Sequence, residues 1–158
     1  MNTNLISKRN AFTMIELVFV IVVLGILAAI AIPKFAATRD DAQITKGRSD
    51  VAAIRSAIVS ERQTRLLQGD SVYINHLDGL AGATSSNGDL LFDNNGTATR
   101  VLLQYGIASG TTNGHWRKTA ADRYQFRILN ADTEFTYTQA TGAFDCTHTN
   151  ANCKLLTE

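Results

Sequence analysis

The side chains best suited to chemistry in this sequence are the thiols of Cys146 and Cys153, which lie close together near its end. In an oxidising compartment two thiols at this spacing form a short disulfide loop. In a reducing compartment they suggest a metal site, which needs four ligands, and His148 is the only further ligand nearby. The compartment of the C-terminal segment therefore decides between these two interpretations.

A second candidate is Glu16, the one charged residue of a long apolar run. No charged or strongly polar side chain follows it between Leu17 and Ile32. An unpaired carboxylate in a bilayer or a protein core costs several kcal/mol, so a carboxylate kept there normally has a partner. Alternatively, Glu16 lies solvated at the headgroup boundary.

The remaining polar residues do not form a catalytic pattern. No nucleophile, base and orienting residue occur together, and no phosphate-binding glycine motif follows a strand. His76, His115 and His148 are too scattered for a metal centre, so the sequence predicts a protein that is not an enzyme and has no cofactor. Four residues could supply oxygen ligands to calcium, although residues of these types also form ordinary turns: Asp89, Asp93, Asn94 and Asn95.

Length and charge exclude several classes of protein. The 158 residues suffice for one domain with a core, and the 45% hydrophobic content argues against disorder. The formal net charge is +1, from 15 basic and 14 acidic residues, so electrostatics give no case for nucleic acid as the main partner.

The apolar run predicts a membrane-spanning helix. A helix over residues 12–33 would be about 33 Å long, which exceeds the roughly 30 Å hydrocarbon core of a bilayer. Lys8 and Arg9 precede the run and favour a cytoplasmic N-terminus. A secretory signal peptide cleaved near residues 28–31 is the alternative.

The residues around the start of this run resemble a known processing site. Residues 11–17 read Ala-Phe-Thr-Met-Ile-Glu-Leu and resemble the prepilin peptidase site of type IV pilins and type II secretion pseudopilins. Residues 24–33 also match that family closely. Two positions depart from its usual pattern, because Ala11 stands where Gly is commoner and Met14 where Leu is commoner; both changes are chemically mild.

The resemblance implies a specific maturation and assembly. Residues 1–11 would be a leader peptide, cut by prepilin peptidase between Ala11 and Phe12, with methylation of the new Phe12 amine. Glu16 would pair with the Phe12 amine of a neighbouring subunit and so fix the axial register. The subunit would wait among inner-membrane lipids with its head in the periplasm. An assembly platform would then add it to other pilins in an extracellular pilus or a periplasmic pseudopilus.

The elements that must position these residues begin with one long helix over residues 13–68. Residues 12–33 would form its filament-core part, and residues 34–158 a head that includes the amphipathic half of the helix. Pro33 predicts a kink near residues 29–33, or else marks the end of the span. The predicted buried stripe comprises Ile44, Val51, Ile54, Ile58 and Leu66, widened by Ala42, Ala52, Ala53 and Ala57.

The residue pattern in the rest of the head predicts a small antiparallel sheet. Alternating residues indicate strands over 100–107, 123–128, 134–138 and 143–146, with a turn at 130–132 and a short helix at 74–82. The predicted fold class is therefore α+β, in which a long N-terminal helix packs on an antiparallel sheet as in the pilin fold. In an exported head the two cysteines are expected to form a disulfide.

Several uses remain open for such a head. Trp116 lies in a Gly-rich segment, where its indole either stacks on a ligand such as DNA or covers the core edge. A basic strip would support DNA binding: Arg100, Arg117, Lys118, Arg123 and Arg127. Within the family the sequence is compatible with a surface pilus, a secretion pseudopilus or a DNA-uptake pseudopilus. A monomeric membrane-anchored binding module is the main alternative, and a cleaved secreted enzyme is a third.

Overall fold

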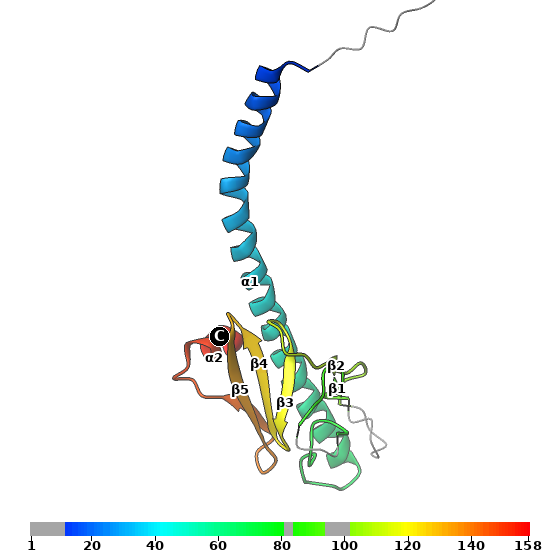
Figure 1. Ribbon diagram of the computed structural model, residues 1–158. Coiled ribbons are helices and arrows are strands. Elements are labelled where there is room, and N and C mark those ends of the chain that lie inside the picture. The colour runs from blue at the N-terminus through cyan, green and yellow to red at the C-terminus, as the bar shows by residue number, and fades with distance from the viewer. Residues whose placement is uncertain (1–11, 81–83, 94–101) are drawn as a thin grey trace, which may run out of the picture. The chain divides into compact units, whose positions relative to one another are not determined.

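Helices and strands occupy the expected halves of the chain in the computed structural model, which describes residues 12–80, 84–93 and 102–158 (Figure 1). The helices are α1 (Met14–Leu67) and α2 (Ala151–Thr157). The strands are β1 (Leu90–Leu91), β2 (Ile107–Ala108), β3 (Trp116–Ala120), β4 (Arg123–Ile128), β5 (Ala131–Thr138) and β6 (Ala143–Cys146). The chain divides into two compact units, Met1–Arg39 and Asp40–Glu158, and we call the second unit the head.

Helix α1 matches the long helix expected from the sequence. It ends at a Schellman motif, in which the Gly69 N–H donates to the Leu66 carbonyl (3.1 Å) and the Asp70 N–H to the Arg65 carbonyl (2.9 Å). Gly69 adopts a φ of +83°, which residues with a Cβ rarely adopt, so the glycine fixes the end of the helix. Pro33 lies within the bounds of α1, and the kink there remains a prediction.

Strands β3 to β6 form one antiparallel sheet in sequence order. Tyr124 of β4 lies opposite Phe135 of β5, and Tyr137 of β5 lies opposite Phe144 of β6. All four are buried, as the alternation in the sequence predicts, and the α+β class is confirmed. Leu129 and Asn130, both at positive φ, join β4 to β5, so the turn begins one residue before the predicted 130–132.

The head core lies between α1 and this sheet. Val51, Ile54 and Ile58 are buried on the helix side. A Cβ added at Gly47 would lie 2.4 Å from the Phe126 ring and 2.5 Å from Leu156, so only glycine permits this close approach of α1. Six buried aromatic residues line the sheet side: Trp116, Tyr124, Phe126, Phe135, Tyr137 and Phe144.

The C-terminal segment is attached to α1 by arginines. The Arg48 Nε donates to the Leu155 carbonyl (2.5 Å), and the Arg55 Nε donates to the Phe144 carbonyl (2.9 Å). Helix α2, which the sequence analysis did not predict, begins after Asn150, whose side chain accepts a hydrogen bond from the Asn152 N–H. These contacts fix the end of the chain beside the helix rather than leaving it as a tail.

The predicted buried stripe of α1 was too wide. Leu66 is 50% exposed, because it follows Ile58 by eight residues, which places it roughly 80° around the helix from that buried residue. Ala52 and Ala53 are also exposed, since each lies a full 100° step around the helix from a buried neighbour, Val51 or Ile54. Ala42 is exposed as well.

Two predicted elements are wrong in the part of the head that the structure describes. The strand expected over 100–107 is reduced to β2, because residues 102–105 form bends instead. The short helix expected at 74–82 does not form over residues 74–80. There the Ile74 carbonyl accepts a hydrogen bond from the Tyr137 hydroxyl (2.7 Å), so this carbonyl is bonded to the sheet and not within a helix.

Tyr137 gives the head a predictable response to alkali. Burial raises the pKa of Tyr137 to about 12, above the value of about 10 in an unfolded chain. The neutral hydroxyl therefore stabilises the fold below pH 10, and this contribution is lost as the pH rises towards 12.

We expect the head of the Tyr137→Phe variant to be about 1 kcal/mol less stable at pH 7, because the hydrogen bond to the Ile74 carbonyl is lost. From pH 8 to pH 11 the variant should lose about 1.4 kcal/mol less than the parent. Urea denaturation at the three pH values measures both differences. If the two proteins lose the same amount of stability between pH 8 and pH 11, the raised pKa of Tyr137 is not the cause of the alkaline destabilisation.

Candidate assembly surfaces

The start of α1 is fixed by its own side chains. The Thr13 hydroxyl accepts a hydrogen bond from the Glu16 N–H (3.3 Å), and the Thr13 carbonyl accepts one from the Leu17 N–H (3.2 Å). Thr13 is thus the N-cap and Glu16 the third helical residue, the spacing of a capping box. This role was not predicted from the sequence, although Thr followed by Glu three residues later is a recognised signal for it.

Glu16 is exposed at the first turn of α1. In the described ranges of the chain, no cation lies within ion-pair distance of its carboxylate. A carboxylate in the first turn is favoured by the positive end of the helix dipole. Phe12 precedes the helix and is 78% exposed, whereas Ala11 lies outside the described residues. Cleavage at Ala11–Phe12 and the assembly role of Glu16 therefore remain predictions.

Residues after Glu16 present apolar side chains on all sides of the helix. Met14–Ile32 has a mean hydropathy of 3.1 and is long and apolar enough to cross a membrane. None of this segment is buried within the chain, and Phe19, Ile26 and Ile30 are each more than half exposed. A helix that is apolar all round is stable only inside a membrane or among other helices. This segment therefore needs partners outside its own chain.

In the head, α1 has an outward face without charge. Every exposed residue of α1 between positions 49 and 67 is uncharged. We call these ten residues the outer face: Ser49, Ala52, Ala53, Ser56, Val59, Ser60, Gln63, Thr64, Leu66 and Leu67. An ordinary solvated helix face carries charged side chains, so the outer face is suited to contact with another protein surface.

The charged residues of the same helix segment are partly buried and bonded to the head. The Asp50 carboxylate accepts from the Trp116 Nε1–H (3.0 Å), and Arg65 pairs with Glu61 (3.1 Å). Arg62 lies over the Tyr73 ring, 4.4 Å from its centroid. This helix segment therefore does contain charged residues, but none of them belongs to the outer face.

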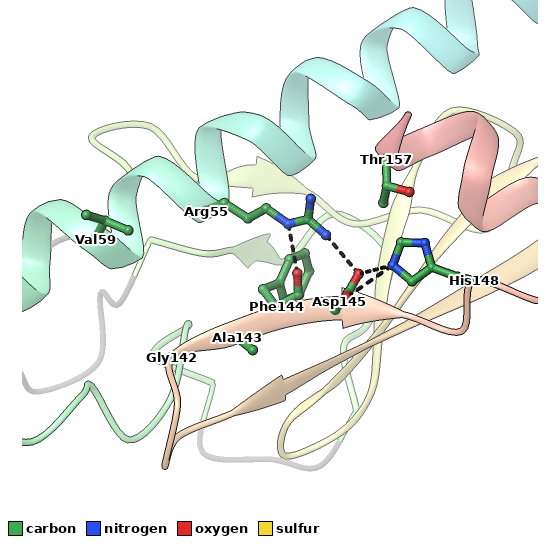
Figure 2. A pocket seen from close by; sticks show the side chains of 8 residues that line it. All are labelled: Arg55, Val59, Gly142, Ala143, Phe144, Asp145, His148 and Thr157. Atoms are coloured by element: carbon green, nitrogen blue, oxygen red, sulfur yellow. Dashed lines mark hydrogen bonds and ion pairs between the residues drawn. The ribbon is translucent and has the colours of Figure 1, made fainter.

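Cys146 and Cys153 are joined by a disulfide, with Cα atoms 5.8 Å apart. The bridge closes the loop between β6 and α2. A groove of about 410 Å³ lies beside it, lined by α1, β6, the disulfide loop and α2. Figure 2 shows Asp145 at its centre, where the carboxylate accepts from Arg55 (2.8 Å) and lies 3.2 Å from the His148 ring. These exposed ion pairs mainly position the loop.

The basic strip predicted for DNA binding does not form as expected. Lys118 is buried, and Arg100 lies outside the described residues. The exposed arginines face acidic neighbours: Arg117 and Arg127 both pair with Asp132, at 3.4 and 3.3 Å, and Arg123 lies 3.8 Å from Glu134.

Trp116 cannot stack on a base, because its indole is fully buried. It belongs to β3 and to the core, not to the loop expected from the sequence. The oxygen-rich residues considered for calcium are only partly described: the Asp89 carboxylate accepts from the Ser86 N–H (2.6 Å), Asp93 is buried, and Asn94 and Asn95 lie outside the described residues. The absence of a cofactor, with calcium as the alternative, stays a prediction from the sequence.

Comparison with known proteins supports the conclusion that the exposed N-terminal helix needs partners outside its own chain. Residues 6–32 match the model of the prokaryotic N-terminal methylation motif. Over 114 residues the chain is 34% identical to the type IV major fimbrial protein FimA of Dichelobacter nodosus, an alignment that covers 68% of each chain. The chain belongs to the type IV pilin family. The resemblance recognised in residues 11–17 and 24–33 is thereby confirmed.

Two further relatives show how the similarity is distributed. The type IV narrow pilus major component PilA5 of Thermus thermophilus is 32% identical over 67% of this chain and 96% of its own length. The type II secretion system core protein G of Pseudomonas aeruginosa is 39% identical, but over only 32% of this pilin and 36% of that protein. No solved structure matches the chain. The similarity to pilins thus extends into the head, and the apolar helix fits a membrane-anchored pilin or pseudopilin.

Proposed function

We propose that this pilin is a structural subunit of a type IV pilus or pseudopilus and has no catalytic activity. The observation that carries the proposal is the helix Met14–Ile32, which is apolar on all sides and has Glu16 as its only charge. In the membrane, lipid covers this helix. In the filament, helices of other subunits replace the lipid.

Processing prepares the subunit for assembly. Prepilin peptidase cuts between Ala11 and Phe12 and leaves a methylated amine on Phe12, four residues before Glu16. That amine is the natural cation for the Glu16 carboxylate of a neighbouring subunit. An ion pair shared between subunits penalises every axial offset that leaves one charge unpaired, so it specifies the register.

Orientation and partners follow from the same segment. Lys8 and Arg9 hold the N-terminus in the cytoplasm, so the head lies in the periplasm before assembly. The partners are prepilin peptidase, inner-membrane lipid, an assembly platform in that membrane, and other pilins. The assembled filament is an extracellular pilus or a periplasmic pseudopilus.

The outer face of α1 extends the assembly contact into the head. Its small residues, such as Ala52 and Ser56, let another helix approach closely, and Val59 and Leu66 supply apolar contact area. The face repeats at steps of three and four residues, the spacing of a helix-packing seam. A second pilin packed against the outer face would not have to remove water from any charged side chain of that face.

The Val59→Glu variant tests this contact. Val59 is 55% exposed, so the stability of the isolated head should change by no more than about 0.5 kcal/mol. Burial of the new carboxylate between subunits costs several kcal/mol, which lowers association on the order of a hundredfold. We expect the yield of sheared filaments to fall accordingly, measured by quantitative immunoblot and electron microscopy.

The matched control is Val59→Ser, which removes apolar area at the same position without adding charge. It should retain filaments at reduced yield. Normal filament yield from Val59→Glu would show that the outer face stays solvated in the assembly and would overturn its assignment as a subunit contact.

A further inference from the structure

A lysine and an aspartate lie in contact inside the head core. The Lys118 Nζ, on β3, is 2.6 Å from the Asp78 Oδ1, on the connection that follows α1. The two side chains are 2% and 0% exposed. Two opposite charges kept from water at this distance are unusual, because desolvation of each ion costs several kcal/mol.

The surroundings hold the two groups in a fixed geometry. The Tyr124 hydroxyl donates to the Asp78 Oδ2 (2.7 Å), and the Lys118 Nζ also donates to the Leu80 carbonyl (3.1 Å). The Phe92 ring packs against the Tyr124 ring, with their centroids 4.7 Å apart. The amine, the carboxyl group and a hydroxyl donor are thus held together in the core, where the first two are almost wholly shielded from water.

Condensation of the two groups begins with transfer of one proton from the ammonium to the carboxylate. This step yields a neutral amine beside a neutral carboxylic acid and removes two charges from a site of low dielectric. A neutral amine is a nucleophile, and a protonated carboxyl carbon is an electrophile. The fixed contact supplies the proximity that condensation otherwise lacks.

We propose that Lys118 and Asp78 condense in the folded head to form an intramolecular isopeptide bond. The Lys118 Nζ attacks the Asp78 Cγ, and an N–C bond forms. Oδ1 carries the proton first received from the ammonium, takes a second proton from the attacking nitrogen, and leaves as water when its bond to Cγ breaks. The third ammonium proton remains on the amide nitrogen, so no oxidant, reductant or other reactant is needed.

Tyr124 stabilises the intermediate of this reaction. Negative charge develops on Oδ2 when the nitrogen attacks, and the Tyr124 hydroxyl already donates to that atom. Burial, reinforced by the charge of Asp78, raises the pKa of Tyr124 far above its usual value, so the hydroxyl keeps its proton. The bond would tie the connection after α1 to the sheet covalently, as the disulfide ties the C-terminal segment.

Peptide mapping of the mature full-length protein tests the inference directly, and it does not depend on the proposed function. Complete tryptic digestion of an unlinked chain cleaves after Lys118 and gives separate peptides 66–100 and 119–123. A linked chain resists cleavage at Lys118 and gives 66–100 joined to 118–123, lighter by one water than the sum of the two peptides. Recovery of the joined species is the expected result.

Mass alone does not suffice, because Asp78 precedes Gly79 and can lose water by forming a succinimide. A succinimide lightens peptide 66–100 but leaves Lys118 free to be cleaved. That outcome, or recovery of both peptides unmodified, would overturn the proposal and leave a buried ion pair.

Two variants assign the atoms. Lys118→Met should remove the joined peptide completely. Tyr124→Phe keeps the ring and removes the hydroxyl, and it should lower the joined fraction severalfold at equal times after synthesis. A joined fraction unchanged by Tyr124→Phe would exclude Tyr124 as the group that stabilises the intermediate.

Discussion

Replacement of Glu16 with leucine is expected to abolish filament assembly while the protein remains in the membrane. The change makes the helix from Met14 more apolar, so membrane insertion is retained. The helix start is also retained, because Thr13 bonds to the main-chain N–H of residue 16 rather than to its side chain. The loss should therefore fall on assembly alone, through an unpaired Phe12 amine in the filament core.

The measurement is the amount of pilin in sheared filaments relative to the membrane fraction, with the N-terminus of the membrane form sequenced to verify processing. Glu16→Asp keeps the charge on a shorter side chain and serves as the matched control, with partial assembly expected. Filaments at parental yield from Glu16→Leu would favour the solvated headgroup position for Glu16. A parental chain that never forms filaments would favour the monomeric membrane-anchored module.

The second large effect is expected at Lys118. Lys118→Met keeps much of the packing volume but leaves the fully buried Asp78 without the lysine, whether the lysine acts as its counter-ion or is joined to it by the proposed amide. An uncompensated buried charge destabilises by about 3–5 kcal/mol, a large part of the total stability of a small domain. We expect the head to unfold at clearly lower urea concentration, and expression in the membrane to fall with it.

The double variant Lys118→Met/Asp78→Asn separates charge from packing. The asparagine amide introduced by Asp78→Asn carries no charge, and its oxygen can still accept from the Tyr124 hydroxyl. We expect the double variant to be more stable than Lys118→Met alone by about 1–3 kcal/mol. Equal stability of the two variants would show that packing, and not the unpaired carboxylate, accounts for the loss.

The same lysine explains why the sequence did not reveal β3. A strand is recognised by alternation of apolar and polar residues, and Lys118 occupies an inward position between the sheet and the loop residue Asp78. Nothing local in the sequence indicates that a partner forty residues earlier buries the lysine. Strands β4 and β5 were predictable because their inward residues, such as Tyr124 and Phe135, are mostly large and apolar.

Helix α1 was predictable in extent but only partly in the direction of its faces. Its length follows from continuous periodicity and from the stop at Gly69. The alanines at 52 and 53 fit a buried stripe and an exposed assembly face equally well by residue type. Only the position of the sheet decides between them. The assembly roles proposed for Phe12 and Glu16 rest on a resemblance, because such roles depend on partners outside the chain.

The most direct test is the N-terminal sequence and mass of the mature protein from the membrane and sheared-filament fractions. Filament assembly through a processed helix predicts a chain that begins at N-methylated Phe12 and is recovered in the filament fraction. A chain that begins near residue 32 would instead be an ordinary secreted domain, and an intact Met1 would be a simple membrane anchor. Either result would contradict assembly through Glu16 and the Phe12 amine.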